Sequence, residues 1–348
     1  MTIPGLPEEI TADWISRALG ARFPGARARA VQVVDAHSGT TGRARLRVDW
    51  EDAGGAPAAI FAKLVPTDPI QKQMVLTTGM GRREARFYAE LAGSMPVRVA
   101  APYHAEWNEE GSAYLMLMED LAESGCSFPS WKDPRLSETA GLMMDGLAEL
   151  HRHFRESPRF EEELAWIEPP MRSEFGPLMV KSAVEQFGDE MPPAFHDAAR
   201  IYIEHTDAVN ERLDEGVPTL LHGDSHLGNL FLDGDRIGFL DWACTCRGPG
   251  VRDVAYFLSN SVPTELRRAE ERDLLQRYLG GLDEGPTFDE AWKQYRLYAI
   301  CGWVAATVTA AAGSRMQALE VGMRSMRRST DAIIDLETPE LLRAELGL

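Results

Sequence analysis

The stretch from Leu220 to Asp241, LLHGDSHLGNLFLDGDRIGFLD, constrains this chain more than any other segment. Asp224 precedes Asn229 by five positions, and a short apolar run after the Asp233-Gly234-Asp235 turn leads to Asp241. Turn residues between apolar runs predict a hairpin. The segment is therefore expected to gather two carboxylates and one amide around a loop and a small hairpin.

Phosphoryl transfer requires this order of parts. The transferred group carries negative charge spread over its oxygens, so a site needs a carboxylate that orients the attacking hydroxyl and oxygen ligands for magnesium. We predict that Asp224 orients the hydroxyl and that Asn229 and Asp241 bind magnesium. The spacing D-x-x-x-x-N also occurs in the catalytic loop of protein kinases, where the metal-binding Asp follows on the next strand.

The motif H-G-D-x-H-x-G-N, followed by an apolar strand that ends in Asp-Trp, resembles the aminoglycoside phosphotransferase and choline kinase superfamily. The residues that carry it are His222, Gly223, Asp224, His226, Gly228, Asn229 and Asp241. Downstream, GPGVRDVAYFL is similar to the family's segment in which an aspartate opens a helix, so a structural role is expected for Asp253. The sequence departs from the common family wording at Leu227, where proline is often found.

The resemblance implies an α+β, protein-kinase-like fold of two lobes. The N-terminal lobe is expected to hold an antiparallel sheet with one helix and to bind the nucleotide, and the C-terminal lobe to be mainly helical, catalytic and substrate-binding. The expected boundaries are residues 1–118 for the first lobe, 119–121 for the hinge and 122–348 for the second lobe. By analogy with kinases, the backbone from Glu119 to Leu121 is the candidate for hydrogen bonding to adenine.

Lys63 interrupts the apolar strand AAIFAKLV and is expensive to bury unless it is paired. It lies either on a solvated sheet face or beside a phosphate and a carboxylate, and the order lysine strand, glutamate helix, catalytic loop favours the second. The expected partner is Glu84, 21 positions later in the helical stretch GRREARFYAELAG. The wording R-E-x-x-F-Y in this stretch also resembles the superfamily.

A turn between two alternating strands, at 31–35 and 44–50, is the candidate cover for the nucleotide phosphates. Its residues are Gly39, Thr40, Thr41 and Gly42. Backbone N–H groups can approach a nucleotide closely where glycine has no side chain in the way. Further strands are expected at 103–107 and 113–118, and helices at 137–155 and 289–312.

Two histidines and one helix need separate interpretation. We expect His222 to brace the catalytic loop through hydrogen bonds and His151, beside core leucines, to be structural. The helix at 289–312 carries several aromatic residues, and if it lines the acceptor pocket, that pocket is apolar. Such a lining favours an alcohol on a hydrophobic scaffold over a polycationic sugar. The aromatic residues are Trp292, Tyr295, Tyr298 and Trp303.

Three other functions were weighed. The pattern H-x-D-x-H at His222, Asp224 and His226 alternates as a strand does and could surround one metal in a hydrolase, but it leaves Asn229 and Asp241 unexplained. A protein kinase is disfavoured by the absence of D-F-G and A-P-E. A non-catalytic nucleotide-binding protein would be favoured by the loss of any of five residues, and all are present: Lys63, Glu84, Asp224, Asn229 and Asp241.

Composition limits the partners and the cellular compartment that are expected for this chain. Hydrophobic residues form 44% of the 348, enough for a sizeable core, and the formal net charge of −18 disfavours binding to nucleic acid and anionic membranes. Four cysteines without C-x-x-C spacing favour a reducing compartment. The N-terminus has no basic segment followed by an apolar run, and the longest apolar stretch, 298–313, is too short to span a bilayer. A cytoplasmic protein is therefore expected.

Together these features predict a phosphotransferase that uses ATP and Mg²⁺, with GTP as the alternative nucleotide. The acceptor would be a hydroxyl of a small molecule of the aminoglycoside, choline or other alcohol type. Lys63, fixed by Glu84, would position the nucleotide phosphates.

Overall fold

The computed structural model describes residues 2–313 and 317–348, and the chain divides into two compact units. The first unit comprises Met1–Ser127 and Phe231–Cys244, and the second comprises Phe128–Leu230 and Thr245–Leu348. Each unit is described by itself below.

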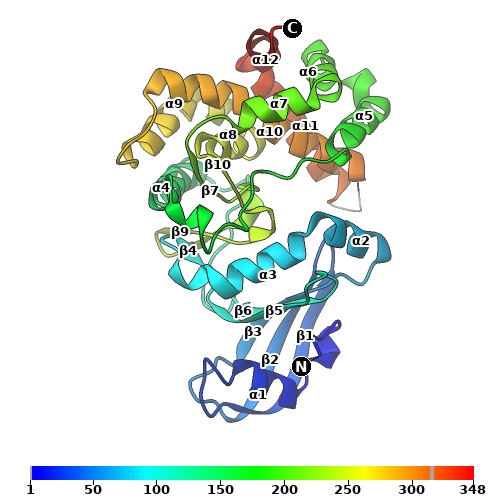
Figure 1. The fold of residues 1–348 in the computed structure, drawn as a ribbon, viewed down its shortest axis with the longest axis vertical. Helices are drawn as coiled ribbons and strands as arrows, with labels where there is room; N and C mark the ends of the chain where they lie inside the picture. The colour runs from blue at the N-terminus through cyan, green and yellow to red at the C-terminus, as the bar shows by residue number, and fades with distance from the viewer. Residues whose placement is uncertain (1, 314–316) are drawn as a thin grey trace. The chain divides into compact units, whose positions relative to one another are not determined.

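A five-stranded antiparallel sheet, in the order β1-β2-β3-β6-β5, forms the base of the first unit (Figure 1). In β2, Ala44, Leu46 and Val48 are buried while Arg45 and Arg47 between them point away from the core, which is the alternation expected of a strand with one buried face. The strands predicted for the N-terminal lobe lie within or overlap these elements. They are β1 (Arg27–Ser38), β2 (Gly42–Asp52), β3 (Ala59–Leu64), β5 (Pro102–Trp107) and β6 (Tyr114–Glu119).

Three α-helices accompany this sheet, where the sequence predicted one. Trp14, Ile15 and Leu19 of the first helix pack against Leu46 and other residues of the sheet's apolar face. The two unpredicted helices are short, and their starts are fixed by side-chain caps that a search for long apolar stripes does not register. The helices are α1 (Ala12–Leu19), α2 (Pro69–Thr78) and α3 (Met80–Glu90), with 3-10 turns at η1 (Pro7–Glu9) and η2 (Ala92–Ser94).

Residues 231–244 belong to the first unit, whereas the sequence placed them in the second lobe. A three-stranded sheet of order β4-β9-β8 holds them there, with β4 and β9 parallel. Trp242 then stacks on Phe87 of α3, with ring centroids 4.3 Å apart. The lobe boundary at 118 and the hinge at 119–121 stay predictions. The elements are β4 (Arg98–Val99), β8 (Leu230–Asp233), β9 (Arg236–Phe239) and η6 (Trp242–Cys244).

The second unit is mainly helical and contains one antiparallel ribbon of β7 and β10. The ribbon elements are β7 (Pro218–Leu221) and β10 (Cys246–Pro249), and the 3-10 turns are η3 (Pro158–Glu161), η4 (Gly188–Glu190) and η5 (Leu227–Asn229). The helices are α4 (Leu136–Phe154), α5 (Phe175–Phe187), α6 (Pro193–Glu204), α7 (Thr206–Asp214), α8 (Val251–Asn260), α9 (Thr264–Gly280), α10 (Phe288–Ala312), α11 (Leu319–Asp335) and α12 (Thr338–Leu346).

Helix α10 is the central element of this unit and contacts α5, α8 and α11 among others (Figure 1). A capping box between Thr287 and Glu290 starts it. Gly302 lets it approach α8 closely, because a Cβ at this position would collide with the Ser259 hydroxyl. The predicted aromatic pocket lining is corrected here, since three of its four members are buried in the core: Tyr295, Tyr298 and Trp303.

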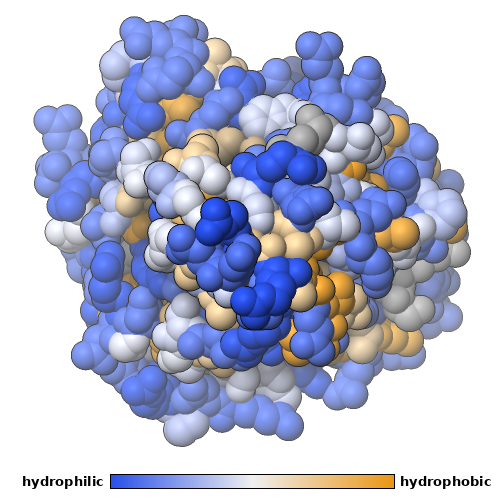
Figure 2. All heavy atoms as spheres, turned by 90° about the horizontal axis from the view of Figure 1, so that it is seen from below, coloured by the Kyte–Doolittle hydropathy of each residue, from blue (hydrophilic) through white to orange (hydrophobic). Residues whose placement is uncertain are grey.

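The face drawn in Figure 2 is largely hydrophilic, with apolar residues distributed among hydrophilic ones. All four cysteines are free thiols. Among the described residues, no helix combines the length and the apolar composition that crossing a bilayer requires.

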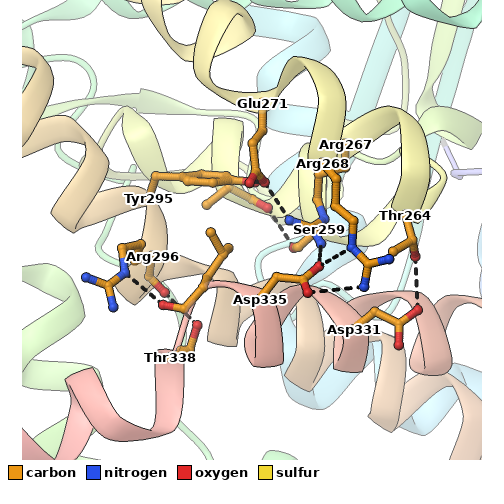
Figure 3. A network of polar contacts seen from close by, with 12 residues as sticks. Ser259, Thr264, Arg267, Arg268, Glu271, Tyr295, Arg296, Asp331, Asp335 and Thr338 are labelled. Carbon is orange, nitrogen blue, oxygen red and sulfur yellow. Dashed lines mark hydrogen bonds and ion pairs between the residues drawn. The ribbon is translucent and has the colours of Figure 1, made fainter.

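A buried arginine ties three helices of the second unit together (Figure 3). Arg267 on α9 donates to Glu271 at 2.5 Å and to Asp335 on α11. The hydroxyl of Tyr295 on α10 donates to the same Glu271 carboxylate at 2.7 Å. Arg267 is fully buried, so its charge depends on these carboxylates for compensation.

Replacing this arginine should be costly. We expect Arg267→Ala to lower the free energy of unfolding by about 3 kcal/mol, because it leaves buried carboxylate oxygens without their cation. Urea denaturation measures the change. Arg268→Ala is the matched control: Arg268 also binds Asp335, but its side chain is 45% exposed and water can replace it. Equal losses for the two variants would contradict this interpretation.

Candidate active site

The alternation of β3 turns Lys63 away from the apolar core. Ala62 and Leu64 on either side of it pack in the core against α1, so Lys63 faces the opposite side of the sheet. There its Nζ lies 2.6 Å from Glu84 Oε1 on α3 and 3.4 Å from Asp241 Oδ1. The ion pair predicted from the sequence is therefore formed, and Asp241 joins it within the first unit.

Lys63 is held as a cation. Burial disfavours its charged form, but the carboxylates of Asp241 and Glu84 outweigh burial and raise the pKa of Lys63. Glu84 is fully buried, and its Oε2 has no hydrogen-bond partner among the described residues. The lysine thus supplies a fixed positive charge at a place where water is largely excluded.

Asp241 has an unusual backbone. Its φ is 64°, in the left-handed region that residues other than glycine rarely adopt, and such strain gathers at functional sites. Its side chain is 25% exposed and lies between two cations, with Arg43 Nη2 3.9 Å away. A partly exposed carboxylate is a hard oxygen ligand, so Asp241 fits a magnesium site. Arg43 was missed from the sequence, although it is the cross-strand neighbour of Lys63 and shares its sheet face.

The glycine turn lies where β1 passes into β2. The Gly39 N–H donates to Thr41 O at 3.1 Å, Thr40 is half-buried and Thr41 is buried. A Cβ at Gly42 would lie 2.9 Å from the Val65 carbonyl oxygen, so close backbone packing explains this glycine. Its role as a phosphate cover stays a prediction.

The predicted hinge is partly engaged in internal hydrogen bonds. The Glu119 N–H donates to Ala101 O at 2.9 Å, and the Leu121 carbonyl accepts from Cys126 N–H at 3.0 Å. Glu119 also uses its carboxylate internally, on Arg98 at 2.7 Å. The Asp120 carbonyl likewise accepts from Glu123 and Ser124, so the backbone groups of 119–121 that remain for the predicted adenine contacts are the Glu119 carbonyl, the Asp120 N–H and the Leu121 N–H.

The catalytic loop of the second unit is anchored on Asp253 near the start of α8. The Asp253 carboxylate accepts from the backbone N–H groups of His222 at 2.7 Å and Gly223 at 3.1 Å, and Ser225 Oγ donates to the Asp253 backbone oxygen at 2.9 Å. Glycine is required at 223, where φ is 80°. The expected structural role of Asp253 follows from these bonds.

A buried histidine supports this anchor from behind. His151 Nε2 lies 3.3 Å from Asp253 Oδ2, and its Nδ1 lies 2.9 Å from the Tyr278 hydroxyl. Burial opposes ionisation of Asp253, but the hydrogen bond from His151, the nearby histidines and the His222 N–H outweigh it and lower the pKa of Asp253. His151 is thus buried with both ring nitrogens satisfied, as the sequence predicts.

Both oxygens of the Asp224 carboxylate are held. The Tyr256 hydroxyl donates to Oδ1 at 2.6 Å, and Asn229 Nδ2 donates to Oδ2 at 3.1 Å and to the Asp224 backbone oxygen at 2.9 Å. With its NH₂ group turned toward Asp224, the Asn229 amide leaves its oxygen as the atom for a metal. His222 Nδ1 accepts the Asp224 N–H at 3.3 Å, which is the bracing role predicted for it.

Tyr256 is the main residue that sequence reasoning missed. It lies three positions after Asp253 on α8, and residues three apart share a helix face. Since Asp253 was expected to lie beneath the loop, the same spacing could have brought Tyr256 to the loop as well.

The metal-hydrolase pattern is not assembled. His222 and His226 each accept a loop N–H with Nδ1, from Asp224 and Gly228 respectively. Among the residues the structure describes, no group of three or more His, Cys, Asp or Glu side chains is placed to hold a metal ion.

Comparison with known proteins identifies the family. The family model described as phosphotransferase enzyme family matches residues 75–298, well over half of the chain. The chain belongs to this family. The family resemblance seen in the sequence is thereby confirmed, as is the expected enzyme class, a phosphotransferase acting on a hydroxyl group; the metal-hydrolase alternative is set aside.

Solved structures confirm the kinase-like fold class. A candidate aminoglycoside phosphotransferase from Ralstonia eutropha is 16% identical, with a TM-score of 0.59 over 94% of this chain and 97% of the other. Plasmodium vivax ethanolamine kinase is 16% identical, with a TM-score of 0.53 over 89% and 82%. Spectinomycin phosphotransferase in complex with ADP and spectinomycin is 13% identical, with a TM-score of 0.51 over 97% and 100%. A search of curated protein sequences gave no match.

The Asp253 anchor makes a stability prediction that depends on pH. We expect Asp253→Asn to lower the free energy of unfolding by about 3 kcal/mol at pH 7, because an NH₂ group would then face backbone N–H donors in a buried place. The folded-state pKa of Asp253 is lowered, so its contribution is fully present above the unfolded pKa of about 4 and is lost as pH falls through the folded value.

Chemical denaturation between pH 3 and pH 7 measures both effects. The difference between parent and variant should be constant down to about pH 4 and shrink below it. Asp235→Asn, at an exposed position in the turn between β8 and β9, is the control and should change little. A difference in the free energy of unfolding that grows as the pH falls would contradict the role of Asp253 as an anchor of the loop.

Proposed function

We propose that this protein transfers the γ-phosphate of ATP, in a magnesium-dependent reaction, to a hydroxyl group of a small molecule. The observation that carries the proposal is the buried Lys63, placed between Glu84 and the partly exposed, strained Asp241. A lysine and a carboxylate in this arrangement offer a cation for nucleotide phosphates and an oxygen ligand for magnesium.

In the first unit, Lys63 would bind the nucleotide phosphates while Glu84 fixes its position. The turn Gly39, Thr40, Thr41, Gly42 would cover the phosphates, and the Glu119 carbonyl and Leu121 N–H would meet the adenine edge. Bound magnesium would neutralise charge on the transferred phosphoryl group, with Asp241 and Asn229 as its protein ligands. The nucleotide in this proposal is ATP, with GTP as the alternative.

In the second unit, Asp224 would act on the acceptor. Hydrogen bonds from Tyr256 and Asn229 fix both of its oxygens, so the carboxylate is oriented before the acceptor arrives. Asp224 then accepts the proton of the acceptor hydroxyl while the hydroxyl oxygen forms a bond to the γ-phosphorus. The bond from that phosphorus to the bridging oxygen breaks, and the nucleoside diphosphate leaves. Preorganisation of this kind lowers the barrier because no group has to move during the reaction.

Two isosteric variants separate binding from chemistry. Asp224→Asn should abolish turnover while keeping the rise in melting temperature caused by magnesium and ATP. Asp241→Asn should weaken that rise itself, because the phosphate-facing carboxylate is lost. Asparagine is chosen at 241 because it tolerates left-handed backbone, so the variant should fold. Thermal-shift titrations with ATP or GTP, with and without magnesium, measure binding, and ADP release with a panel of alcohols measures turnover.

Parent-like turnover by Asp224→Asn would sink the assignment of the hydroxyl-orienting carboxylate. An unchanged nucleotide response in Asp241→Asn would remove Asp241 from the magnesium site. No response of the parent to either nucleotide would argue for a protein that has lost nucleotide binding.

Tyr256 should matter for rate more than for affinity. Tyr256→Phe removes one hydrogen bond to the Asp224 carboxylate, and bonds to charged groups contribute roughly 1.5–3 kcal/mol. We expect kcat to fall about tenfold or more, with little change in nucleotide KM. A fall in melting temperature with unchanged kcat would instead assign Tyr256 a purely structural role.

A further inference from the structure

The second unit contains a cavity of about 460 Å³ that the proposed reaction does not yet use. Three arginines of α11, Arg324, Arg327 and Arg328, line it together with Trp131. We call this cavity the arginine pocket. Its rim includes the pair of Thr264 and Asp331, joined by a 3.0 Å hydrogen bond (Figure 3). Three cations around one cavity are notable in a chain with a net charge of −18.

One of these arginines lacks a carboxylate partner. Arg324 pairs with Glu320 at 2.6 Å, and Arg327 pairs with Glu190 at 2.9 Å. Arg328 instead donates from Nη1 to two backbone carbonyls, and no carboxylate of the described residues lies within 4 Å of it. Burial and the charge of Arg324 lower the pKa of Arg328 to about 10. A guanidinium still charged near neutral pH but without a counterion would be stabilised by an anion that enters the pocket.

An aromatic side chain, Trp131, lies beside these charges in the pocket lining. The Arg324 guanidinium lies 4.3 Å from the centroid of the Trp131 ring, so the indole forms a flat surface beside the cations. An anionic group attached to an apolar or ring-containing body matches this combination. The lining also includes the carboxylates of Glu320 and Asp331, so three arginines against two carboxylates leave a formal charge of +1, which favours an anion over a polycation.

Hydrogen bonds connect the arginine pocket to the catalytic loop. Arg328 donates to the carbonyls of Asn260 and Ser261, at 2.9 and 2.8 Å, at the end of α8. Ser261 Oγ in turn accepts the N–H of Leu227 in the loop at 2.9 Å. Tyr256, which binds Asp224, precedes Asn260 by one helical turn, ~6 Å along the axis. Arg328 and Leu227, which lies three positions after Asp224, thus both bind Ser261, so the pocket adjoins the catalytic loop.

We propose that the arginine pocket binds an anionic group of the acceptor, so that the substrate is an alcohol bearing a carboxylate or a phosphate. This inference rests on the proposed phosphotransfer to a hydroxyl. It names the substrate class: hydroxy acids and phosphorylated alcohols, whose negative charge sits in the arginine pocket while a hydroxyl reaches Asp224.

The acceptor panel should therefore be built from matched pairs. Each hydroxy acid is tested beside its neutral methyl ester, each sugar phosphate beside the free sugar, and both beside choline and an aminoglycoside, with ADP release as the readout. We expect the anionic member of a pair to have a kcat/KM at least tenfold above its neutral counterpart. Preference for carboxylates or for phosphates identifies which anion the pocket takes.

Substitutions of the pocket arginines test whether the preference for anionic acceptors arises in the arginine pocket. Arg328→Gln and Arg324→Gln should each raise KM for the anionic acceptor about tenfold, while the nucleotide-induced rise in melting temperature stays at the parent value. Arg328→Lys keeps the charge and a donor to the carbonyls, so it should retain most of the affinity and shows whether loss in Arg328→Gln reflects misfolding. Arg200→Gln is the matched control, because Arg200 is exposed and pairs with Asp197 outside the pocket.

Calorimetry with inorganic phosphate and with acetate, on the same variants, needs no turnover. Binding to the parent that both glutamine variants lose supports the anion site, even if no alcohol is phosphorylated and the proposed function fails. Turnover of neutral or cationic alcohols at least as good as that of anionic ones, unchanged in Arg328→Gln, would overturn the pocket assignment and leave the phosphotransferase standing.

Discussion

The geometry of the catalytic loop depends on a single buried carboxylate. Asp253 accepts two consecutive backbone N–H groups of the loop and is supported by His151 and, through it, by Tyr278. These N–H groups lie just past the end of the β7–β10 ladder, whose last pair is Leu221 with Cys246, so a side-chain acceptor has to satisfy them. The anchor fixes the backbone at 222 and 223, and the orientation of Asp224 then follows from its bonds to Tyr256 and Asn229.

Buried charge is used in the same way in both units. Lys63 in the first and Arg267 in the second are surrounded by carboxylates that offset the cost of removing a cation from water. The two charge clusters differ in whether they are open to solvent. Arg267 meets carboxylates on two helices and a tyrosine supports one of them, which is a closed network. Lys63 meets Asp241, whose partly exposed side chain leaves the arrangement open to solvent.

The sequence predicted most of the fold and much of the site, because both depend on local patterns. Alternation placed β2 and β3, and the spacing of Lys63 and Glu84 predicted their ion pair. The helices α1 and α2 were missed because caps rather than apolar stripes fix their starts. The packing of 231–244 was also missed, since the pairing of β9 with β4 joins segments more than a hundred residues apart. No motif marks Arg43 or Tyr256 in the sequence. The strand register brings Arg43 close to Asp241, and the face of α8 brings Tyr256 to Asp224.

The stacking of Trp242 on Phe87 links helix α3, which carries Glu84, to the backbone at Asp241. Phe87 lies three positions after Glu84 on α3, and Trp242 directly follows Asp241 in the chain. Arg83 of the same helix also donates to the Ala243 carbonyl at 3.1 Å. A rotation of α3 that withdrew Glu84 from Lys63 would therefore drag the backbone at Asp241 with it. The positions of Glu84 and Asp241 are thus linked through helix α3. We therefore expect the contacts of Lys63 with both carboxylates to form or break together.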